Sequence, residues 1–449
     1  MSVASEKPIR LAVLGGSCTG KTSFISRLTV DIVREAHYPT RKQNNWLFTF
    51  NPTDPLARAI LDEKAHERYY YSDEHAVPEP VFRTPSITDH VLLSPPVYQS
   101  FIQNYQMVKH ALAVGQRLAD QRTLLKSDNQ YYQYKNEDVG HGPDSCSRRT
   151  ARLQERTRRR GAVDRCLPSN YTPPRYSSIS IDIIDTPAYD PDMVIPFLEV
   201  SLFSNLDKSI LRGLADHPRK PVSTQSLLVA SGASELNGKV DGYIFVYSAL
   251  PELNYAEPPS YDSLNRVSGG VGQAPAQGQA VEYKRTSAQD GGFSLLSSIR
   301  ACFLDAWTEF RNYQRRAAQI KEGDIYSLMY SLKQAWKPDP QATGKDKGTR
   351  ELSASLDQID LNPDSPNSPP PMLIICTHIL DPLHSPLLVE HGKRLAVEWK
   401  CAFVALDSMS DFNVDVAMAC IIRDIVEKEK LLNKHITKKK GVLHKIIKG

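Results

Sequence analysis

The stretch IRLAVLGGSCTGKTSFISRL, residues 9–28, decides the fold of this chain. It begins with an apolar run, Leu11 to Leu14, that is typical of a buried parallel strand. A glycine-rich turn follows, and apolar residues then recur at helical spacing from Phe24 to Ile32. A strand, a tight turn and a helix in this order predict a βα unit at the start of an α/β domain.

The glycine turn also satisfies the pattern of a phosphate-binding loop. Gly15 and Gly20 bracket four residues, and Lys21 and Thr22 come next, which is the spacing GxxxxGK[ST] in its required strand–loop–helix context. Glycines let backbone N–H groups curl around phosphate oxygens, and the helix start adds the positive end of its dipole. We therefore expect Lys21 to reach the β- and γ-phosphates and Thr22 to hold Mg²⁺. A chance glycine turn is the alternative.

The composition is that of a globular chain with long irregular segments. The 449 residues leave room for two or three domains, with 41% hydrophobic and 24% charged residues and 31 unevenly placed prolines. The net charge of +4 is too small to imply a nucleic-acid partner by itself, so we predict no DNA binding. Seven cysteines without a CxxC pair favour a reduced, cytoplasmic location, and no apolar run is long enough to cross a bilayer.

Apolar strands alternate with helical patterns along part of the chain. This predicts an α/β fold with a mostly parallel six-stranded sheet and helices on both faces. We assign the nucleotide-binding domain to residues 8–50, 176–250 and 371–432. The other segments are a partly helical, partly disordered and basic insertion at 51–175, a flexible insertion at 251–292, a long helical region at 293–336, a disordered insertion at 337–370 and a basic tail at 433–449.

Polar residues follow several of the predicted strands. Asp185, Thr377 and Asp407 come at the carboxyl ends of three apolar runs, where open α/β sheets bind their ligands. A carboxylate at the end of a strand beside a phosphate-binding loop is suited to hold Mg²⁺ directly or through water. Thr40 lies in the loop between the first helix and the second strand, so we expect it to be a second threonine ligand of Mg²⁺, beside Thr22.

With these residues assembled, the chain resembles a Ras-like small GTPase of the P-loop NTPase superfamily with large insertions. Tyr38-Pro39-Thr40 resembles the first switch, and Asp185-Thr186 resembles the start of the DxxG motif. Residues 389–425 are similar, without gaps, to the final helix–strand–loop–helix of Ras-type proteins. The matching pieces cover roughly half of the chain. The largest insertion falls in the hairpin between the second and third strands, at the sheet edge, where extra sequence should disturb the core least.

The resemblance implies a GTP/GDP-binding switch in signal transduction, with Mg²⁺ as cofactor and with effector and regulator proteins as partners. The nucleotide-binding residues that it implies are Gly15, Gly16, Ser17, Cys18, Thr19, Gly20, Lys21, Thr22, Ser23, Ala188, Thr377, His378, Asp381, Asp407 and Ser408. Its catalytic positions are Lys21, Thr40 and Tyr189, and its Mg²⁺ ligands are Thr22, Thr40 and Asp185.

Two of the family motifs are altered in this sequence. Ala188 stands at the DxxG glycine and Tyr189 at the catalytic glutamine. Because tyrosine has no carboxamide to orient the attacking water, we expect slow hydrolysis. The base motif Asn-Lys-x-Asp is replaced by residues 377–380, and the nearest carboxylate, Asp381, comes one residue late. Either the loop bulges so that Asp381 contacts guanine, or guanine selectivity is weakened.

Two other functions are compatible with the same residues. One is a nucleotide-binding or empty scaffold that acts through its insertions. The other is a P-loop kinase for a small molecule. At the carboxyl end, six lysines are interleaved with aliphatic residues between positions 434 and 448. We expect this tail to bind an anionic membrane surface at the cytoplasmic face. A solvated tail is the alternative.

Overall fold

A computed structural model of the chain describes residues 8–33, 39–40, 44–72, 79–115, 127, 129–135, 166–168, 170–188, 240–251, 290–301, 303–304, 307 and 360–448. Several predictions lie outside these residues. They concern Tyr189, most of the flexible insertion at 251–292, most of the helical region at 293–336 and the start of the insertion at 337–370.

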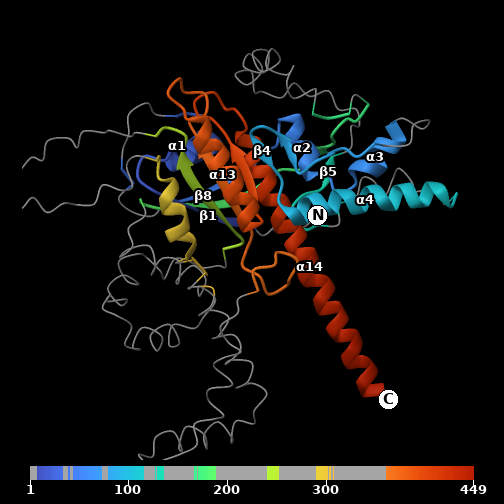
Figure 1. The fold of residues 1–449 in the computed structure, drawn as a ribbon. Coiled ribbons are helices and arrows are strands. Elements are labelled where there is room, and N and C mark those ends of the chain that lie inside the picture. The colour runs from blue at the N-terminus through green and yellow to red at the C-terminus, as the bar shows by residue number, and fades with distance from the viewer. Residues whose placement is uncertain are drawn as a thin grey trace, which may run out of the picture.

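A mixed sheet of eight strands lies at the centre of the described structure (Figure 1). Its strand order is β2-β7-β1-β8-β9-β10-β4-β3. Its strands are β1 (Ile9–Gly15), β2 (Asn44–Phe50), β3 (Ser86–Thr88), β4 (Val91–Leu92), β7 (Ile179–Asp185), β8 (Gly242–Ser248), β9 (Met372–Thr377) and β10 (Ala402–Ala405). The strands from β7 to β10 in this order are parallel, whereas β2, β4 and β3 pair antiparallel. The α/β class is confirmed. The prediction of six strands was wrong, because residues 86–92 of the insertion add two short strands.

Helices cover both faces of this sheet. The helices on the sheet are α1 (Lys21–Val30), α13 (Pro386–Trp399) and α14 (Val414–Lys448), together with residues 293–301. Further out, α2 (Pro55–Leu61) and α4 (Pro95–Ala113) pack on α14, and α3 (Ala65–Ser72) packs on α4. Alternate residues of a strand point to opposite faces. Leu11 and Val13 accordingly share one apolar core with α1 and α14, and Ala12 and Leu14 share the other with α13 and Phe303. Burial on both faces explains the continuous apolar runs of the central strands.

The insertion that follows β2 reaches from one edge of the sheet to the other. As expected, β2 is an edge strand and forms an antiparallel hairpin with β7, and the insertion lies between the two. However, α2 then packs along α14, and β4 pairs with β10 near the opposite edge. Leu56, Ile60 and Phe101 belong to the same apolar core as β1. The insertion therefore begins at the sheet edge, where the sequence placed it, and also contributes side chains to the main core.

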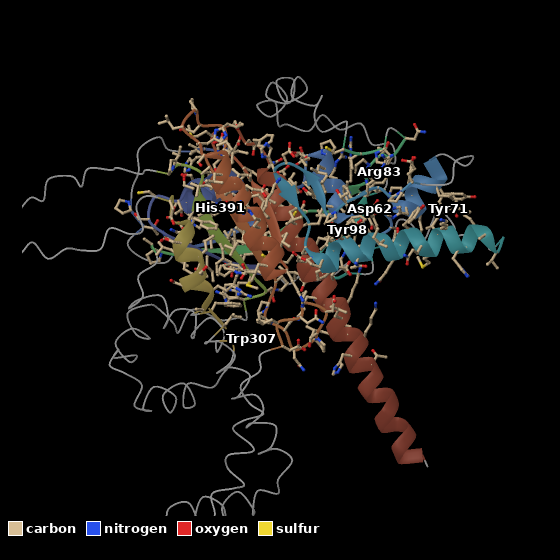
Figure 2. The ribbon with its side chains drawn as sticks, in the orientation of Figure 1. Asp62, Tyr71, Arg83, Tyr98, Trp307 and His391 are labelled. Carbon is tan, nitrogen blue, oxygen red and sulfur yellow. The ribbon has the colours of Figure 1, made fainter. Side chains whose placement is uncertain are left out.

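A buried carboxylate separates α2 from α3 and organises the tyrosines of the insertion. This carboxylate, Asp62, is labelled in Figure 2 and is fully buried. It accepts hydrogen bonds from the hydroxyls of Tyr134 (3.1 Å) and Tyr171 (2.9 Å) and from Nε of Arg68 (3.0 Å). Tyr134 lies on β5 (Tyr134–Lys135), which pairs with β6 (Arg175–Tyr176) as a separate two-stranded sheet. Tyr134 and Tyr171 therefore take part both in the apolar core that contains β1 and in a buried hydrogen-bond network around Asp62.

Basic residues of α14 connect this insertion to the rest of the chain. Arg423 is buried and donates to the carbonyl of Leu61 (3.3 Å), and Lys430 pairs with Glu63 (2.7 Å). The helix continues to Lys448, so the residues that the sequence assigned to a tail from 433 onward are helical up to that point, and their end projects from the body (Figure 1). Among the described residues, no helix has both the length and the apolar character needed to cross a membrane.

Candidate functional site

The candidate site lies at the carboxyl edge of the parallel strands. The loop of residues 15–22, here called the glycine loop, connects β1 to α1 at this edge. Asp185 ends β7, Thr377 ends β9, and Asp407 follows β10 by two residues. The structure therefore brings together the strand-end residues that the sequence singled out. This is the edge at which open α/β sheets bind ligands.

The glycine loop packs closely against the neighbouring strand. A Cβ atom on Gly15 would lie 2.3 Å from the carbonyl oxygen of Val246 in β8, so only glycine fits there. Thr19 Oγ1 donates to the carbonyl of Gly16 (3.1 Å), which closes the loop on itself. Cys18 has a left-handed backbone, with φ of 57°, although non-glycine residues rarely adopt it. The loop has a strained and compact shape, which is common at binding sites.

Lys21 is buried inside this loop. Its Nζ donates to the carbonyls of Gly15 (3.1 Å) and Gly16 (2.6 Å), and its side chain is only 6% exposed. Burial lowers the pKa of Lys21 to about 8, and the nearby Asp185 carboxylate partly opposes this shift. The ammonium group is therefore largely charged at neutral pH and donates to two neutral carbonyls.

Three oxygen-bearing side chains from distant segments meet beside Lys21. Thr22 Oγ1 lies 2.9 Å from Thr40 Oγ1 and donates to Asp185 Oδ2 at 2.7 Å. Asp185 is fully buried, and its Oδ1 has no hydrogen-bond partner among the described residues. Burial raises the pKa of Asp185, while the Thr22 hydroxyl and the Lys21 charge lower it. An orphaned buried carboxylate oxygen is costly unless a ligand or water meets it.

We asked whether these residues fit a Mg²⁺ ion. Mg²⁺ takes oxygen ligands at 2.0–2.1 Å in octahedral geometry, so neighbouring ligands lie about 2.9 Å apart. The separations of Thr22 from Thr40 and from Asp185 are 2.9 and 2.7 Å. One carboxylate and two hydroxyls form a donor set for Mg²⁺ together with phosphate and water. In the described part of the chain, no cluster of three or more His, Cys, Asp or Glu residues offers a different kind of metal site.

Of the DxxG-like stretch that begins at Asp185, the structure describes residues 185–188. Thr186 is buried and donates from Oγ1 to the carbonyl of Val13 (2.6 Å), which fixes the end of β7 to β1. Ala188 is half-buried, and Tyr189 lies outside the described residues. Ser23 lies in the first turn of α1, and Ser17 is exposed at the rim of the glycine loop.

Thr377 and His378 connect the far side of the glycine loop to the strands. Thr377 Oγ1 lies within hydrogen-bonding distance of the carbonyls of Thr19 (2.8 Å) and Tyr247 (3.2 Å). His378 Nδ1 lies 2.9 Å from both Thr377 Oγ1 and Ser248 Oγ. Burial lowers the pKa of His378, which favours the neutral imidazole. These contacts hold the 377–378 segment firmly against the glycine loop.

The carboxylate predicted to contact the base is turned toward its own loop. Asp381 Oδ1 accepts from the backbone N–H of Leu383 (2.8 Å), and the carbonyl of Asp381 lies 2.8 Å from His384 Nδ1. Leu380, where the resemblance to Ras-like proteins led us to expect an aspartate, is 48% exposed. Asp381 is therefore near the site but is used as a turn cap.

The loop after β10 is fixed by a residue that the sequence analysis missed. Arg27 of α1 donates from Nε to the carbonyl of Ser408 (2.6 Å) and from Nη2 to that of Met409 (2.8 Å). Asp407 Oδ2 accepts from the N–H of Ser410 (2.8 Å), and Asp407 pairs with Phe412 through two backbone hydrogen bonds. A lone arginine in an amphipathic helix offers no sequence signal of this role.

A second missed element is the turn before the helix at 293–301. Gly291 accepts the N–H of Ser248 through its carbonyl (2.9 Å). Its φ of +63° and a Cβ position 2.1 Å from the Ser248 oxygen exclude a side chain. Gly292 and Leu295 lie against Thr19 and Gly16 of the glycine loop. The Asp-Gly-Gly sequence at 290–292 was a usable turn signal, but it stood in a segment interpreted as flexible.

Comparison with known proteins adds one relative. Over 436 residues the chain is 51% identical to a protein of Saccharomyces cerevisiae described as "Uncharacterized protein YPR084W". The match covers 96% of this chain and 90% of the yeast protein. No family model matches the chain.

Proposed function

We propose that this chain, which belongs to the family of the yeast protein YPR084W, is a nucleotide-dependent switch of the Ras-like type. The observation that carries the proposal is the meeting of Thr22, Thr40 and Asp185 beside the buried ammonium of Lys21. Thr40 and Asp185 lie 18 and 163 residues from Thr22 in the sequence. Thr22 is exposed and the orphaned oxygen of Asp185 is buried, so apolar packing does not account for the cluster.

Each of these side chains has a definite task in a phosphate site. Lys21 would exchange its two carbonyl acceptors for phosphate oxygens, which are far better partners for an ammonium group. The hydroxyls of Thr22 and Thr40 and the carboxylate of Asp185 would hold Mg²⁺. The ion, when bound with nucleotide, neutralises charge on the phosphates. The glycine loop and the start of α1 would supply backbone N–H groups around the phosphates.

We infer that hydrolysis is slow in the isolated protein. Tyr189 stands where Ras-like proteins carry their catalytic glutamine, and it has no carboxamide for orienting water. A slow switch stays in its triphosphate form until a regulator protein acts on it, and it would signal to an effector in that form. Guanine selectivity is weakened in this proposal, because Asp381 already caps the N–H of Leu383.

Binding of labelled nucleotide to the full-length protein tests the proposal. We expect micromolar or tighter binding of GTP and GDP in Mg²⁺, and loss of binding in Lys21→Ala. Arg394→Ala, an exposed residue on α13 far from the glycine loop in sequence, serves as the matched control. Absence of nucleotide binding by the wild-type protein would contradict the proposal and favour a scaffold. Transfer of the γ-phosphate to a small molecule would favour a kinase.

Single-turnover measurement tests the hydrolysis step separately. We expect GTP to be cleaved more slowly than by an ordinary Ras-like protein measured in parallel. A comparable rate would show that Tyr189 or a neighbouring residue supports catalysis, and the slow-switch part of the proposal would be wrong.

We also propose that the end of α14 attaches reversibly to anionic membranes. The support is its run of lysines among aliphatic residues from 434 to 448 and its projection from the body (Figure 1). Each basic residue near an anionic leaflet contributes about 1 kcal/mol. Co-sedimentation with phosphatidylserine vesicles should disappear when residues 437–449 are deleted. Unchanged co-sedimentation would contradict this attachment.

A further inference from the structure

A pocket opens at the amino edge of the parallel strands, at the opposite edge of the sheet from the glycine loop. Met372, which begins β9, and Cys401, which precedes β10, both line it. Side chains from the helix at 293–301, the end of α13, the start of α4 and the middle of α14 complete it, together with prolines of the segment 363–371. This hollow, here called the amino-edge pocket, is small, open to solvent and mostly apolar, with a few polar groups that converge on it. Such a composition is typical of a ligand site.

Arg300, on the helix at 293–301, lines the amino-edge pocket with a stacked guanidinium. Its Cζ lies over the ring of Trp399, 4.7 Å from the ring centroid. Stacking uses the face of a guanidinium and leaves the N–H donors at its edge available. Within the described residues, Nε of Arg300 has no hydrogen-bond partner, and no ion pair engages the guanidinium. A planar set of donors without an acceptor is suited to a phosphate or a carboxylate.

Two lysines from other elements add positive charge to the same pocket. Lys400 follows the last residue of α13, is exposed and forms no ion pair in the described part of the chain. Lys428 of α14 donates to the carbonyl of Ser365 (2.7 Å) and to Oγ of Ser368. These two contacts hold the proline segment against α14, beside the point where that helix leaves the body (Figure 1). Together with Arg300, the lysines give the pocket a positive potential that attracts anions.

Asp424 of α14 is the one acidic residue that lines the pocket in the described structure. It is only 6% exposed. One of its oxygens accepts from Oγ of Ser94, and the other has no hydrogen-bond partner among the described residues. Burial raises the pKa of Asp424 to about 7, so its carboxyl is about half protonated at neutral pH. Asp424 therefore offsets only a small part of the charge of the three cations, and the pocket favours an anion.

We propose that the amino-edge pocket is a second ligand site, which binds the phosphate group of a small organic phosphate through Arg300 and Lys400. Trp399 and Leu431, which also line the pocket, would contact the organic part of the ligand. A phosphate monoester carries a charge of about −1.5 to −2 at neutral pH, which suits these cations better than the single charge of a carboxylate. The inference goes beyond the nucleotide-dependent function proposed above, because the pocket lies away from the glycine loop and uses none of its residues.

Binding of glycerol 3-phosphate to the full-length protein tests the site. Broadening of the phosphorus NMR signal of the ester is measured as protein is added. The Lys21→Ala variant serves as the background for all other variants, because it removes the cation of the glycine loop and should still bind the ester. In this background, Arg300→Met should lower the affinity about tenfold. Arg394→Met removes a guanidinium from the exposed part of α13 outside the pocket and should change nothing.

Two further variants keep the test decisive if Arg300→Met does not fold. Lys400 has a left-handed backbone, with φ of 55°, which asparagine tolerates. Lys400→Asn should therefore keep the fold and lower the affinity about threefold. Asp424→Asn retains an acceptor for Ser94 and removes the remaining negative charge, so the affinity should rise about threefold. A gain in affinity does not arise from unfolding. Unchanged binding in both variants would overturn the inference.

Vesicles distinguish a soluble phosphate ester from a lipid headgroup. Phosphatidic acid presents glycerol 3-phosphate at the membrane surface, whereas phosphatidylserine carries no phosphate monoester. Co-sedimentation with phosphatidic acid vesicles that falls in Arg300→Met, while co-sedimentation with phosphatidylserine vesicles is unchanged, would assign the site to a lipid. Binding of the soluble ester alone, without this difference between the vesicles, would assign it to a soluble ligand. Both results support the site.

The other outcomes separate this inference from the proposed function. Loss of glycerol 3-phosphate binding in Lys21→Ala, with full binding in Arg300→Met, would place the phosphate at the glycine loop and overturn the inference alone. Wild-type protein that binds GTP but neither the ester nor phosphatidic acid would also overturn it alone. Wild-type protein that binds the ester through Arg300 but does not bind nucleotides would overturn the proposed function and leave the inference standing.

Discussion

The candidate site has a phosphate end, formed by Lys21, Thr22, Thr40 and Asp185, and a base end, formed by residues 377–381 and 407–408. The two ends differ in how their polar groups find hydrogen-bond partners. At the phosphate end, Thr22 contacts Thr40 and Asp185 across 18 and 163 residues, and one buried oxygen is left over. At the base end, Asp381 and Asp407 satisfy N–H groups two and three residues further along. One oxygen of each of these two carboxylates is thus engaged by its own loop. If the proposed function holds, the first set of groups is suited to phosphate and metal, and the second gives little selectivity for a particular base.

The largest effect is expected from removal of the central hydroxyl of the phosphate end. Thr22→Val keeps the shape of the side chain but removes the contacts to Thr40 and Asp185. Loss of a charge-assisted contact costs about 2 kcal/mol, so the Mg²⁺-dependent affinity for GTP should fall about thirtyfold. Titrations with and without Mg²⁺ measure this change.

Thr22→Ser is the matched control for the hydroxyl. It retains the oxygen and should retain most of the Mg²⁺ effect. If Thr22→Val binds GTP with the same Mg²⁺ dependence as wild type, the three oxygens are a structural cluster. The phosphate end would then be no better prepared than the base end.

The pH dependence of phosphate binding should follow Lys21. Its pKa is lowered to about 8 by burial, so the ammonium is charged below that pH and neutral above it. Bound phosphate favours the charged form, and binding above pH 8 must therefore take up a proton. We expect the affinity for tripolyphosphate to fall with rising pH, by at most about tenfold per unit above pH 8. Calorimetry at pH 7, 8 and 9 checks this.

Lys21→Arg separates this effect from general changes with pH. A guanidinium stays charged across the range, so whatever affinity remains in the variant should be flat between pH 7 and 9. A parallel decline in both proteins would mean that another group controls binding.

The meeting of Thr22 and Asp185 at one edge of the sheet could be predicted from the sequence, because its signals are local or lie at strand ends. The spacing from Gly15 to Thr22 is a pattern that is confined to one turn, and Asp185 follows an alternating strand. Parallel strands share one carboxyl edge, so residues at strand ends are expected to meet. The α/β class and the central strands follow from the same apolar runs.

The other features depend on contacts that sequence patterns do not contain. The hydrogen bond from Arg27 to the carbonyl of Ser408 joins residues 381 positions apart. The insertion reaches β10 through the pairing of Val91 with Val404. Long-range pairings of this kind have no periodicity. The buried Asp62 also looks like an ordinary helix break until its tyrosine and arginine partners are known.

A smaller effect is expected from the turn that supports the glycine loop. A methyl group on Gly291 would collide with the carbonyl oxygens of Ser248 and Leu250, at 2.1 and 2.8 Å. The turn must shift, and Gly292 next to it lies against Thr19 of the glycine loop. We expect Gly291→Ala to weaken binding of tripolyphosphate and GTP equally, by about threefold. Binding titrations with both ligands measure it.

Gly242→Ala is a suitable control. Gly291 contacts Ser248, the last residue of β8, whereas Gly242 is the first residue of that strand. Its added methyl group would lie 3.1 Å from the flexible tip of Ile425. It should lower the melting temperature without changing affinity. If Gly291→Ala shows the same result, the turn supports the fold and not the phosphate end.

The smallest effect is expected where the sequence alone left two alternatives open, at Asp381. If a bulged loop let this carboxylate read guanine, Asp381→Ala would lower GTP affinity strongly and leave ATP affinity unchanged, because only guanine presents the N1 and N2 hydrogens to it. In the structure the carboxylate caps the N–H of Leu383. Its removal should then loosen an exposed turn and change the ratio of GTP to ATP affinity by less than about twofold. Competition binding with both nucleotides decides between these results. A large loss for GTP alone would make the base end as well prepared as the phosphate end, and the contrast between the two ends would no longer hold.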